Sequence, residues 1–186
     1  MAISTAGIVL TAPEQHADCI VELAKAGLHL LTEKPLATTT PAATTIADTV
    51  HRTGVKLAVV QNYRHQPTIQ AARHILAAGD LGAMHYITAR FAADYRERGS
   101  WDVGEAHTMP DPLLAEGSIH HLDMIRYLTG QDIATVTAIT TNPPSSSFAG
   151  DAVAGLLLRL TDHGFALYEA TLLAAGTENR WRQEHY

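Results

Sequence analysis

The chain has 186 residues, of which 46% are hydrophobic, and it carries a formal net charge of -6 with a pI near 6.0. This length suits one domain or two small ones, and the apolar content is sufficient to build a core. The acidic balance argues against the basic surface that nucleic acids and anionic membranes require, so we expect neither as a partner.

The single cysteine, Cys19, lies among apolar residues on an expected helix face and has no partner for an internal disulfide. We therefore expect a reduced thiol in a cytoplasmic protein. The best candidate for a membrane segment, Val153 to Leu160, is interrupted by Arg159 and is far shorter than the roughly 18 apolar residues of a spanning helix. The apolar run Ile8 to Ala12 lacks the preceding Lys or Arg of a secretory signal, so we expect a buried strand there.

Strands and helices alternate along the first third of the sequence. The second helix is delimited by Thr40 as the N-cap, Pro41 at the first helical position and Gly54 beyond its end. Such alternation produces right-handed crossovers in a parallel sheet, and the nearly continuous apolar strands suit a sheet covered on both faces. The pattern predicts half of a doubly wound domain, with strand 7–11, helix 14–26 closed by Gly27, strand 28–32, helix 41–53 and strand 55–61.

The pattern changes after Arg64, where we expect a second domain. Its last strands are separated by a proline-serine loop and by a short turn, which together predict an antiparallel meander. Because the chain then continues into the polar tail 176–186, we expect an unfinished sheet with an open edge. The expected elements are helix 68–78, a turn at 79–82, and strands 84–91, 133–141, 153–160 and 165–173.

The segment from Glu116 to Tyr127 combines an apolar helix with a polar stripe. At about 100° per residue, Glu116, His120, Asp123 and Tyr127 fall on one narrow face, and apolar residues cover most of the rest. A polar stripe on such a helix must be satisfied or functional. His121 lies about 100° from His120, so packing or a capping hydrogen bond is expected for it rather than catalysis.

Several short motifs follow one another in a characteristic order. A strand and turn at 8–13 precede His16, and they are followed by Glu33-Lys34-Pro35, Asn62-Tyr63-Arg64 and the run Gly117 to Asp123. Taken together, from about residue 6 to about residue 175, the chain resembles the glucose-fructose oxidoreductase, inositol dehydrogenase and rhizopine-catabolism (Gfo/Idh/MocA) family. The members of this family transfer hydride between NAD(P) and sugars or cyclitols.

The resemblance implies an α/β protein in two parts. Residues 1–64 would form the C-terminal half of a Rossmann-type parallel sheet, and residues 65–186 an incomplete α+β domain with a mainly antiparallel sheet. It further implies NAD or NADP as the cofactor, a sugar or polyol as the substrate, and a homo-oligomer formed through the second domain's sheet.

The resemblance also implies the catalytic residues. His120 occupies the position of the general acid/base, a role that suits imidazole because its unperturbed pKa lies near 6.5. Lys34 would hold the substrate oxygen opposite it and favour a developing alkoxide. Glu116 stands where many members have Asp and is longer by one methylene. The plain alternatives are a surface pair of Lys34 with Glu33 and a satisfied core histidine at His120.

Binding residues are expected at the carboxyl ends of the parallel strands, where open α/β sheets bind ligands. Arg64 follows the last of these strands and is expected either to reach the substrate or to form a structural ion pair. Asp123 and Arg126 are expected to hold the helix against the neighbouring chain rather than to contact the substrate. The cofactor-binding candidates are Thr11, Pro13, His16, Glu33 and Lys34.

Two other features leave alternatives open. Glu116, His120 and Asp123 have a spacing that lets three ligands share a metal ion, but no His-x-x-x-His and no paired cysteines support such a site. The Gly- and Pro-rich segment 101–112 predicts a loop that either shapes a substrate pocket or carries solvated charges. Its polar residues are Asp102, Glu105, His107 and Asp111.

A glycine-rich GxGxxG turn does not occur in the 186 residues. Those glycines let the backbone approach the pyrophosphate of a dinucleotide at a helix N-terminus. Two hypotheses follow. The residues belong to an NAD(P)-dependent sugar or cyclitol oxidoreductase of which this chain is a fragment, or they form a catalytically inactive vestigial or interaction protein that does not bind the dinucleotide.

Overall fold

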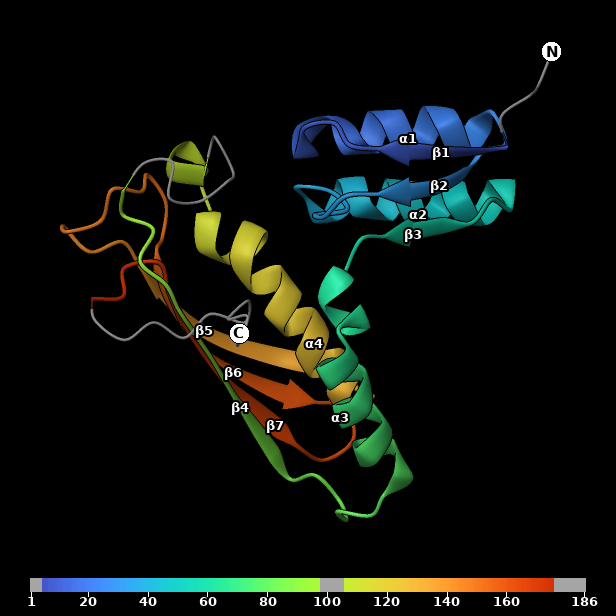
Figure 1. The fold of residues 1–186 in the computed structure, drawn as a ribbon. Helices are drawn as coiled ribbons and strands as arrows, with labels where there is room; N and C mark the ends of the chain where they lie inside the picture. Colours follow the sequence, from blue (N-terminus) through green and yellow to red (C-terminus); the bar gives the residue numbers. More distant parts are fainter. Residues whose placement is uncertain (1–4, 98–105, 176–186) are drawn as a thin grey trace. The chain divides into compact units, whose positions relative to one another are not determined.

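The computed structural model describes residues 5–97 and 106–175, which form two compact units (Figure 1). The chain passes from the first unit to the second between Asn62 and Tyr63, close to the boundary expected after Arg64. Each unit has its own apolar core.

The first unit contains a parallel sheet in the order β1-β2-β3, as expected from the alternating pattern. Helix α1 joins the first two strands, and helix α2 joins the second and third. The strands are shorter than expected, by one residue each in β1 and β2 and by four residues in β3. The elements are β1 (Ala6–Val9), α1 (His16–Lys25), β2 (His29–Thr32), α2 (Thr40–Thr53) and β3 (Leu57–Val59).

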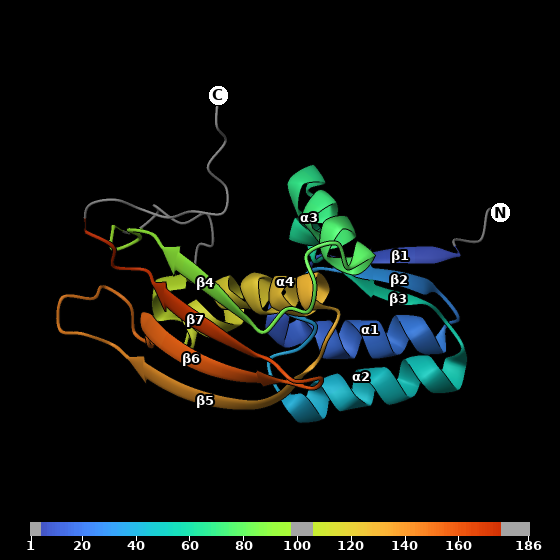
Figure 2. The same cartoon turned by 90° about the horizontal axis from the view of Figure 1, so that it is seen from below.

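Helices α1 and α2 lie on the same side of this sheet, as Figure 2 shows. They bury Ile20 and Ile46 against the sheet. The expectation of a sheet covered on both faces is therefore wrong for the described residues, since Ile8, Leu10 and Leu31 remain exposed on the other side. The physical reason is that two successive right-handed crossovers that advance in one direction place both helices on one face.

The start of α2 also differs from the expectation. Thr39, with extended backbone angles, accepts a hydrogen bond from the amide of Ala42 and is the N-cap. Thr40 is already the first helical residue, so Pro41 moves to the second position, where its missing N–H is still harmless. Gly54 ends the helix with a φ of 71°, as its position predicted. Cys19 on α1 is half-buried and packs against the core of this unit.

The second unit contains a four-stranded mixed sheet in the order β4-β7-β6-β5. The antiparallel meander β5-β6-β7 is confirmed. Strand β4 pairs with β7 in parallel, because the chain leaving β4 passes through helix α4 before it returns as β5. The strands are β4 (Tyr86–Ala92), β5 (Ile133–Thr141), β6 (Val153–Leu160) and β7 (Phe165–Thr171).

Helix α4 (Ile119–Thr129) packs on one face of this sheet and buries Ile125 in the core (Figure 1). Helix α3 (Pro67–Ala78) packs against α4. Short 3₁₀ segments occur at Pro13–Gln15, at Asn62–His65, called η2 here, and at Ala106–Thr108.

A π-helical segment, η4 (Pro112–Ser118), leads into α4 and carries Glu116. The single α-helical stripe expected from Glu116 to Tyr127 is therefore wrong at its first residue. The i→i+5 hydrogen bonding of a π-helix changes the angle between successive side chains, so a 100° spacing does not relate Glu116 to His120. Of the expected loop 101–112, Asp102 and Glu105 lie outside the described residues, as does the tail 176–186.

Candidate functional site

In the first unit, His16 joins the two loops that follow β1 and β2. Its Nε2 lies 3.0 Å from the carbonyl oxygen of Thr11, and its Nδ1 lies 2.7 Å from the carbonyl oxygen of Pro35. The imidazole is only 1% exposed. Both ring nitrogens therefore face protein carbonyl groups, and the side chain fixes the strand-end loops rather than projecting from them.

The residues Glu33 and Lys34 follow directly on β2. The amide of Glu33 donates to the carbonyl of Val9, which extends the pairing of the two strands. The Glu33 carboxylate accepts a hydrogen bond of 3.1 Å from the amide of Lys34 and so folds back over the strand end. Both side chains are half-exposed, and the peptide bond between Lys34 and Pro35 is cis. The lysine thus lies at a parallel strand's carboxyl end, as predicted.

In the second unit, His120 lies on the first turn of α4 and is 9% exposed. Its imidazole stacks on the ring of Tyr63, with the ring centroids 4.5 Å apart and the planes at 17°. Tyr63 comes from η2, in the Asn62-Tyr63-Arg64 motif. The imidazole is therefore buried, and one of its faces lies against an aromatic ring that orients it.

The next residue, Arg64, forms an ion pair with Asp123, which lies one turn beyond His120. Its Nε and Nη2 each donate to one carboxylate oxygen at 2.5 Å. This hydrogen bonding raises the pKa of Arg64 above its ordinary value. The guanidinium carbon also lies 5.3 Å from the centre of the Tyr127 ring. The ion pair expected for Arg64 as one of two alternatives is present, and Asp123 holds the helix to its neighbour.

His121 points into the core, where it joins a buried polar chain. Its Nδ1 lies 2.7 Å from the Tyr168 hydroxyl, which donates to Ser118 Oγ at 2.8 Å. Because the single hydroxyl hydrogen goes to Ser118, the imidazole must donate from Nδ1. Burial, with a smaller contribution from the charge of His120, lowers the pKa of His121 from 6.5 to about 3. The expected packing role is confirmed, and the imidazole is neutral.

The structure brings the predicted residues together in two groups, one in each unit. Lys34 lies in the first group and His120 in the second. Glu116 is 7% exposed on η4, the segment that precedes His120. Tyr63 belongs to the motif Asn62-Tyr63-Arg64, but its residue type and spacing indicated no role for it. Tyr168 carried no signal, because it lies 47 residues from the histidine that it contacts.

Within 5–97 and 106–175, no group of three or more His, Cys, Asp or Glu side chains is placed to hold a metal ion. Nor does any helix in these ranges have the length and apolar character needed to cross a membrane.

Two families of known proteins match the chain, one in each unit. A family described as "Oxidoreductase family, NAD-binding Rossmann fold" matches residues 4–61. A second, described as "GFO/IDH/MocA C-terminal domain", matches residues 69–183, which is more than half of the chain. The chain belongs to the Gfo/Idh/MocA family. The resemblance drawn from the short motifs is thereby confirmed, and so is the α/β fold class of a Gfo/Idh/MocA protein.

Individual Gfo/Idh/MocA relatives are moderately similar. The uncharacterised protein y4oX of Sinorhizobium fredii is 33% identical over 167 residues, which cover 89% of this chain and 46% of the relative. The D-apiose dehydrogenase of Paraburkholderia graminis is 33% identical over 156 residues, covering 81% of this chain and 39% of the relative. The chain thus spans less than half the length of these two relatives.

Solved Gfo/Idh/MocA structures share the fold. An oxidoreductase domain protein from Kribbella flavida superimposes with a TM-score of 0.80 at 25% identity, covering 94% of this chain and 50% of that one. A levoglucosan dehydrogenase in complex with NADH and levoglucosan superimposes with a TM-score of 0.81 at 23% identity, covering 94% and 50%. This likeness establishes the arrangement of strands and helices.

Proposed function

We propose that this chain belongs to an NAD(P)-dependent oxidoreductase that transfers hydride to or from a carbon bearing a hydroxyl group in a sugar, cyclitol or related polyol. The observation that carries the proposal is the position of Lys34, directly after the carboxyl end of β2, in a family described as NAD-binding. Ligands of open α/β sheets bind at this edge. The reduced single cysteine supports a cytoplasmic location for such an enzyme.

In this proposal His120 is the general acid/base. Its imidazole accepts the proton of the substrate hydroxyl during oxidation and returns it during reduction. Lys34 contributes its ammonium group, which stabilises the negative charge that develops on the substrate oxygen. Glu116 assists from η4, the segment that leads into the helix bearing His120.

The strand ends of the first unit fit a nicotinamide cofactor in part. When bound, NAD or NADP supplies the hydride acceptor or donor. Thr11 is exposed, and Pro13, Glu33 and Lys34 are half-exposed, so these residues are available to hold it. His16 has both nitrogens against carbonyl groups, and we assign it the positioning of the two loops instead of a cofactor contact. Residues for the pyrophosphate are not part of this set.

Arg64 has a mainly structural role in this scheme. Two of its three nitrogens are engaged by Asp123 in the described structure, which leaves Nη1 for a substrate hydroxyl. We therefore propose that Arg64 positions η2 against α4 and contacts substrate only through this remaining group.

Replacing His120 by glutamine is expected to lower kcat about a hundredfold, because a positioned acid/base typically contributes at least this factor. The assay uses protein isolated from its source cells, with its intact mass recorded, and NAD or NADP with inositols, apiose and levoglucosan as substrates. His74→Gln is the control, since this residue is exposed on α3.

Each outcome of this assay has a distinct meaning. Turnover that survives in His120→Gln at the wild-type rate removes the acid/base assignment. A wild-type protein that neither binds NADH or NADPH nor turns over any of these substrates supports the alternative, a catalytically inactive vestigial or interaction protein.

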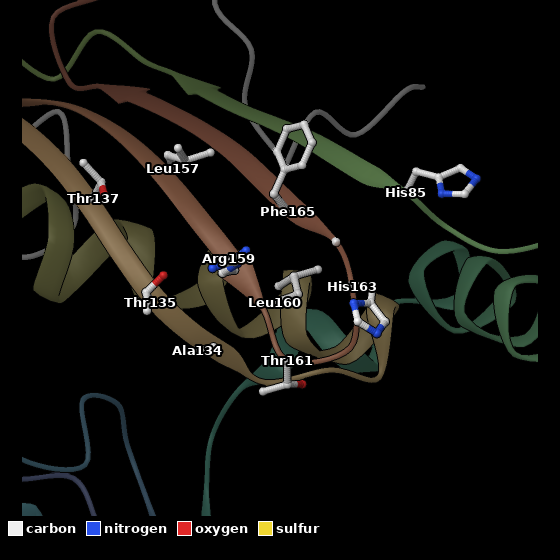
Figure 3. A pocket seen from close by; sticks show the side chains of 11 residues that line it. His85, Ala134, Thr135, Thr137, Leu157, Arg159, Leu160, Thr161, His163 and Phe165 are labelled. Atoms are coloured by element: carbon white, nitrogen blue, oxygen red, sulfur yellow. The ribbon is translucent and has the colours of Figure 1, made fainter.

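We also propose that the outer face of the four-stranded sheet joins copies of the chain. This face lies opposite α4 and is hollowed between β5, β6 and β7, where Leu157 and Phe165 project from neighbouring strands (Figure 3). A group of large, exposed apolar side chains on one face of a sheet is typical of an interface between proteins, and this face carries five of them. They are Tyr86, Ile139, Leu157, Phe165 and Leu167.

Light scattering tests this interface. The wild-type chain is expected to have a molar mass that is a multiple of 20.0 kDa. Leu157→Asp places a charge at the centre of the face and should reduce the mass to that of one chain. Leu81→Asp, in an exposed turn away from the sheet, should leave the mass unchanged. A wild-type mass of one chain would contradict the proposal.

A further inference from the structure

The ring of Tyr63 covers one face of the proposed acid/base. Its centroid lies 4.5 Å from that of the His120 imidazole, at an interplanar angle of 17°. The same ring lies 6.4 Å from His121 at 44°, so of these two histidines His120 is the closer and the more nearly parallel to it. Both Tyr63 and His120 belong to the second unit.

The position of this ring is set by the residue that follows it. Arg64 donates two hydrogen bonds of 2.5 Å to Asp123, whose side chain is only 11% exposed. Asp123 lies three residues after His120 and therefore on the same face of α4. Two consecutive residues of η2, Tyr63 and Arg64, thus contact His120 and Asp123 on one turn of α4. A bidentate guanidinium-carboxylate pair restrains orientation as well as distance, so the backbone of Tyr63 is held over His120.

An imidazole needs such restraint to act as an acid/base. The outer torsion of a histidine side chain has a broad, nearly two-fold energy profile, so rotamer preference alone does not fix the ring plane. A ring packed parallel to the imidazole restricts that torsion. Proton transfer requires the nitrogen within hydrogen-bond reach of the hydroxyl, and a small misplacement lowers the rate strongly.

We propose that Tyr63 is a positioning residue that holds the His120 imidazole in the plane needed for proton transfer. This inference rests on the proposed acid/base role of His120. The stack uses the aromatic face, and the phenolic hydroxyl is not needed for it. Tyr63→Phe therefore keeps the aromatic face and still positions His120. Tyr63→Leu keeps an apolar side chain but loses the aromatic face, so it no longer positions His120.

The test combines kinetics with nuclear magnetic resonance. In Tyr63→Leu, kcat is expected to fall about tenfold with KM within about twofold of wild type, because orientation and not binding is lost. Tyr63→Phe should restore kcat. In protein with labelled histidine, ¹³C relaxation of His120 Cε1 should report greater ring mobility in Tyr63→Leu and wild-type mobility in Tyr63→Phe. His120→Gln identifies the resonance.

Phe148→Leu is the matched control. Phe148 stacks on the ring of His107 with centroids 4.2 Å apart at 5°, so this variant removes a similar histidine-aromatic stack elsewhere in the same unit. We expect it to leave both kcat and the relaxation of His120 within about twofold of wild type.

The outcomes separate this inference from the proposed function. Unchanged ring mobility in Tyr63→Leu overturns the positioning role, whether or not the protein turns over a polyol. Equal losses of kcat in Tyr63→Phe and Tyr63→Leu also overturn the positioning role, since they would show that the effect comes from the phenolic hydroxyl. If Tyr63→Leu does not fold, the chemical shift of the His120 Hε1 resonance in the wild-type protein tests the inference instead. It must lie upfield because of the Tyr63 ring current and must stay there in Tyr63→Phe.

Discussion

Replacing Gly150 by alanine is expected to destabilise the second unit by about 4 kcal/mol or more. A Cβ atom at this position would lie 1.8 Å from the carbonyl oxygen of Pro110 and 2.4 Å from its carbonyl carbon. It would also lie 2.7 Å from Cδ of Pro112, the first residue of η4. Since the first two atoms are backbone, no side-chain rotation relieves the overlap, and two loop segments must separate.

Separating these two loop segments is also expected to disturb the candidate site in the second unit. Pro112 begins the π-helical segment that carries Glu116 and leads into α4, so a displaced Pro110 loosens the support of the helix that bears His120. A loss of this size is a large part of the 5–15 kcal/mol that stabilises a typical domain. Urea unfolding followed by circular dichroism measures it.

Gly155→Ala provides the matched control for this experiment. Gly155 is exposed on β6, and an added Cβ there meets nothing within 4 Å. We expect its free energy of unfolding to stay within about 0.5 kcal/mol of wild type. A Gly150→Ala protein as stable as Gly155→Ala would contradict the close contact between Gly150 and Pro110.

Acid is expected to destabilise the second unit through His121. Burial lowers the pKa of this imidazole from 6.5 to about 3, so the folded state keeps it neutral while the unfolded state binds a proton below pH 6.5. The unfolded state therefore gains stability as the pH falls from about 6.5 towards 3. The contribution is about 1.4 kcal/mol per pH unit in this range, or about 2 kcal/mol by pH 5.

The slope of stability against pH measures this contribution. The free energy of unfolding is determined in urea between pH 7 and pH 4.5 for wild type and for His121→Leu. The variant loses the hydrogen bond to Tyr168 at every pH. The dependence of its unfolding free energy on pH should be weaker than in wild type, because its unfolded state binds one proton fewer in this range. His163→Asn removes an exposed histidine from the β6–β7 turn, where φ is 62°, and should keep the wild-type slope. Equal slopes in wild type and His121→Leu would show that His121 is not held neutral by the fold.

Local patterns predicted the elements that are bounded by clear loop, turn or cap residues. Strands β5 and β6 begin and end where the adjoining loop and turn indicated, and α2 ends at Gly54 as its cap indicated. The N-cap of α2 is Thr39 and not Thr40, an error of one residue that arose because two adjacent threonines offer the same capping hydroxyl. Nothing in the sequence signalled the π-helical turn at Glu116, since its distinguishing hydrogen bonds are a backbone property.

The sequence by itself determined the family, the parallel strands with Lys34 at one strand end, and the helix that carries His120. These features depend on residue type and short spacing, and both are visible in a linear chain. Only the tertiary structure decided which partners meet. Arg64 and Asp123 are 59 residues apart, and Tyr168 and Ser118 are 50 residues apart. Such pairs form because the packing of η2, α4 and β7 brings them within hydrogen-bond distance. The same packing determines that His121 is buried and neutral, and that its neighbour His120, which is also buried, stacks on Tyr63.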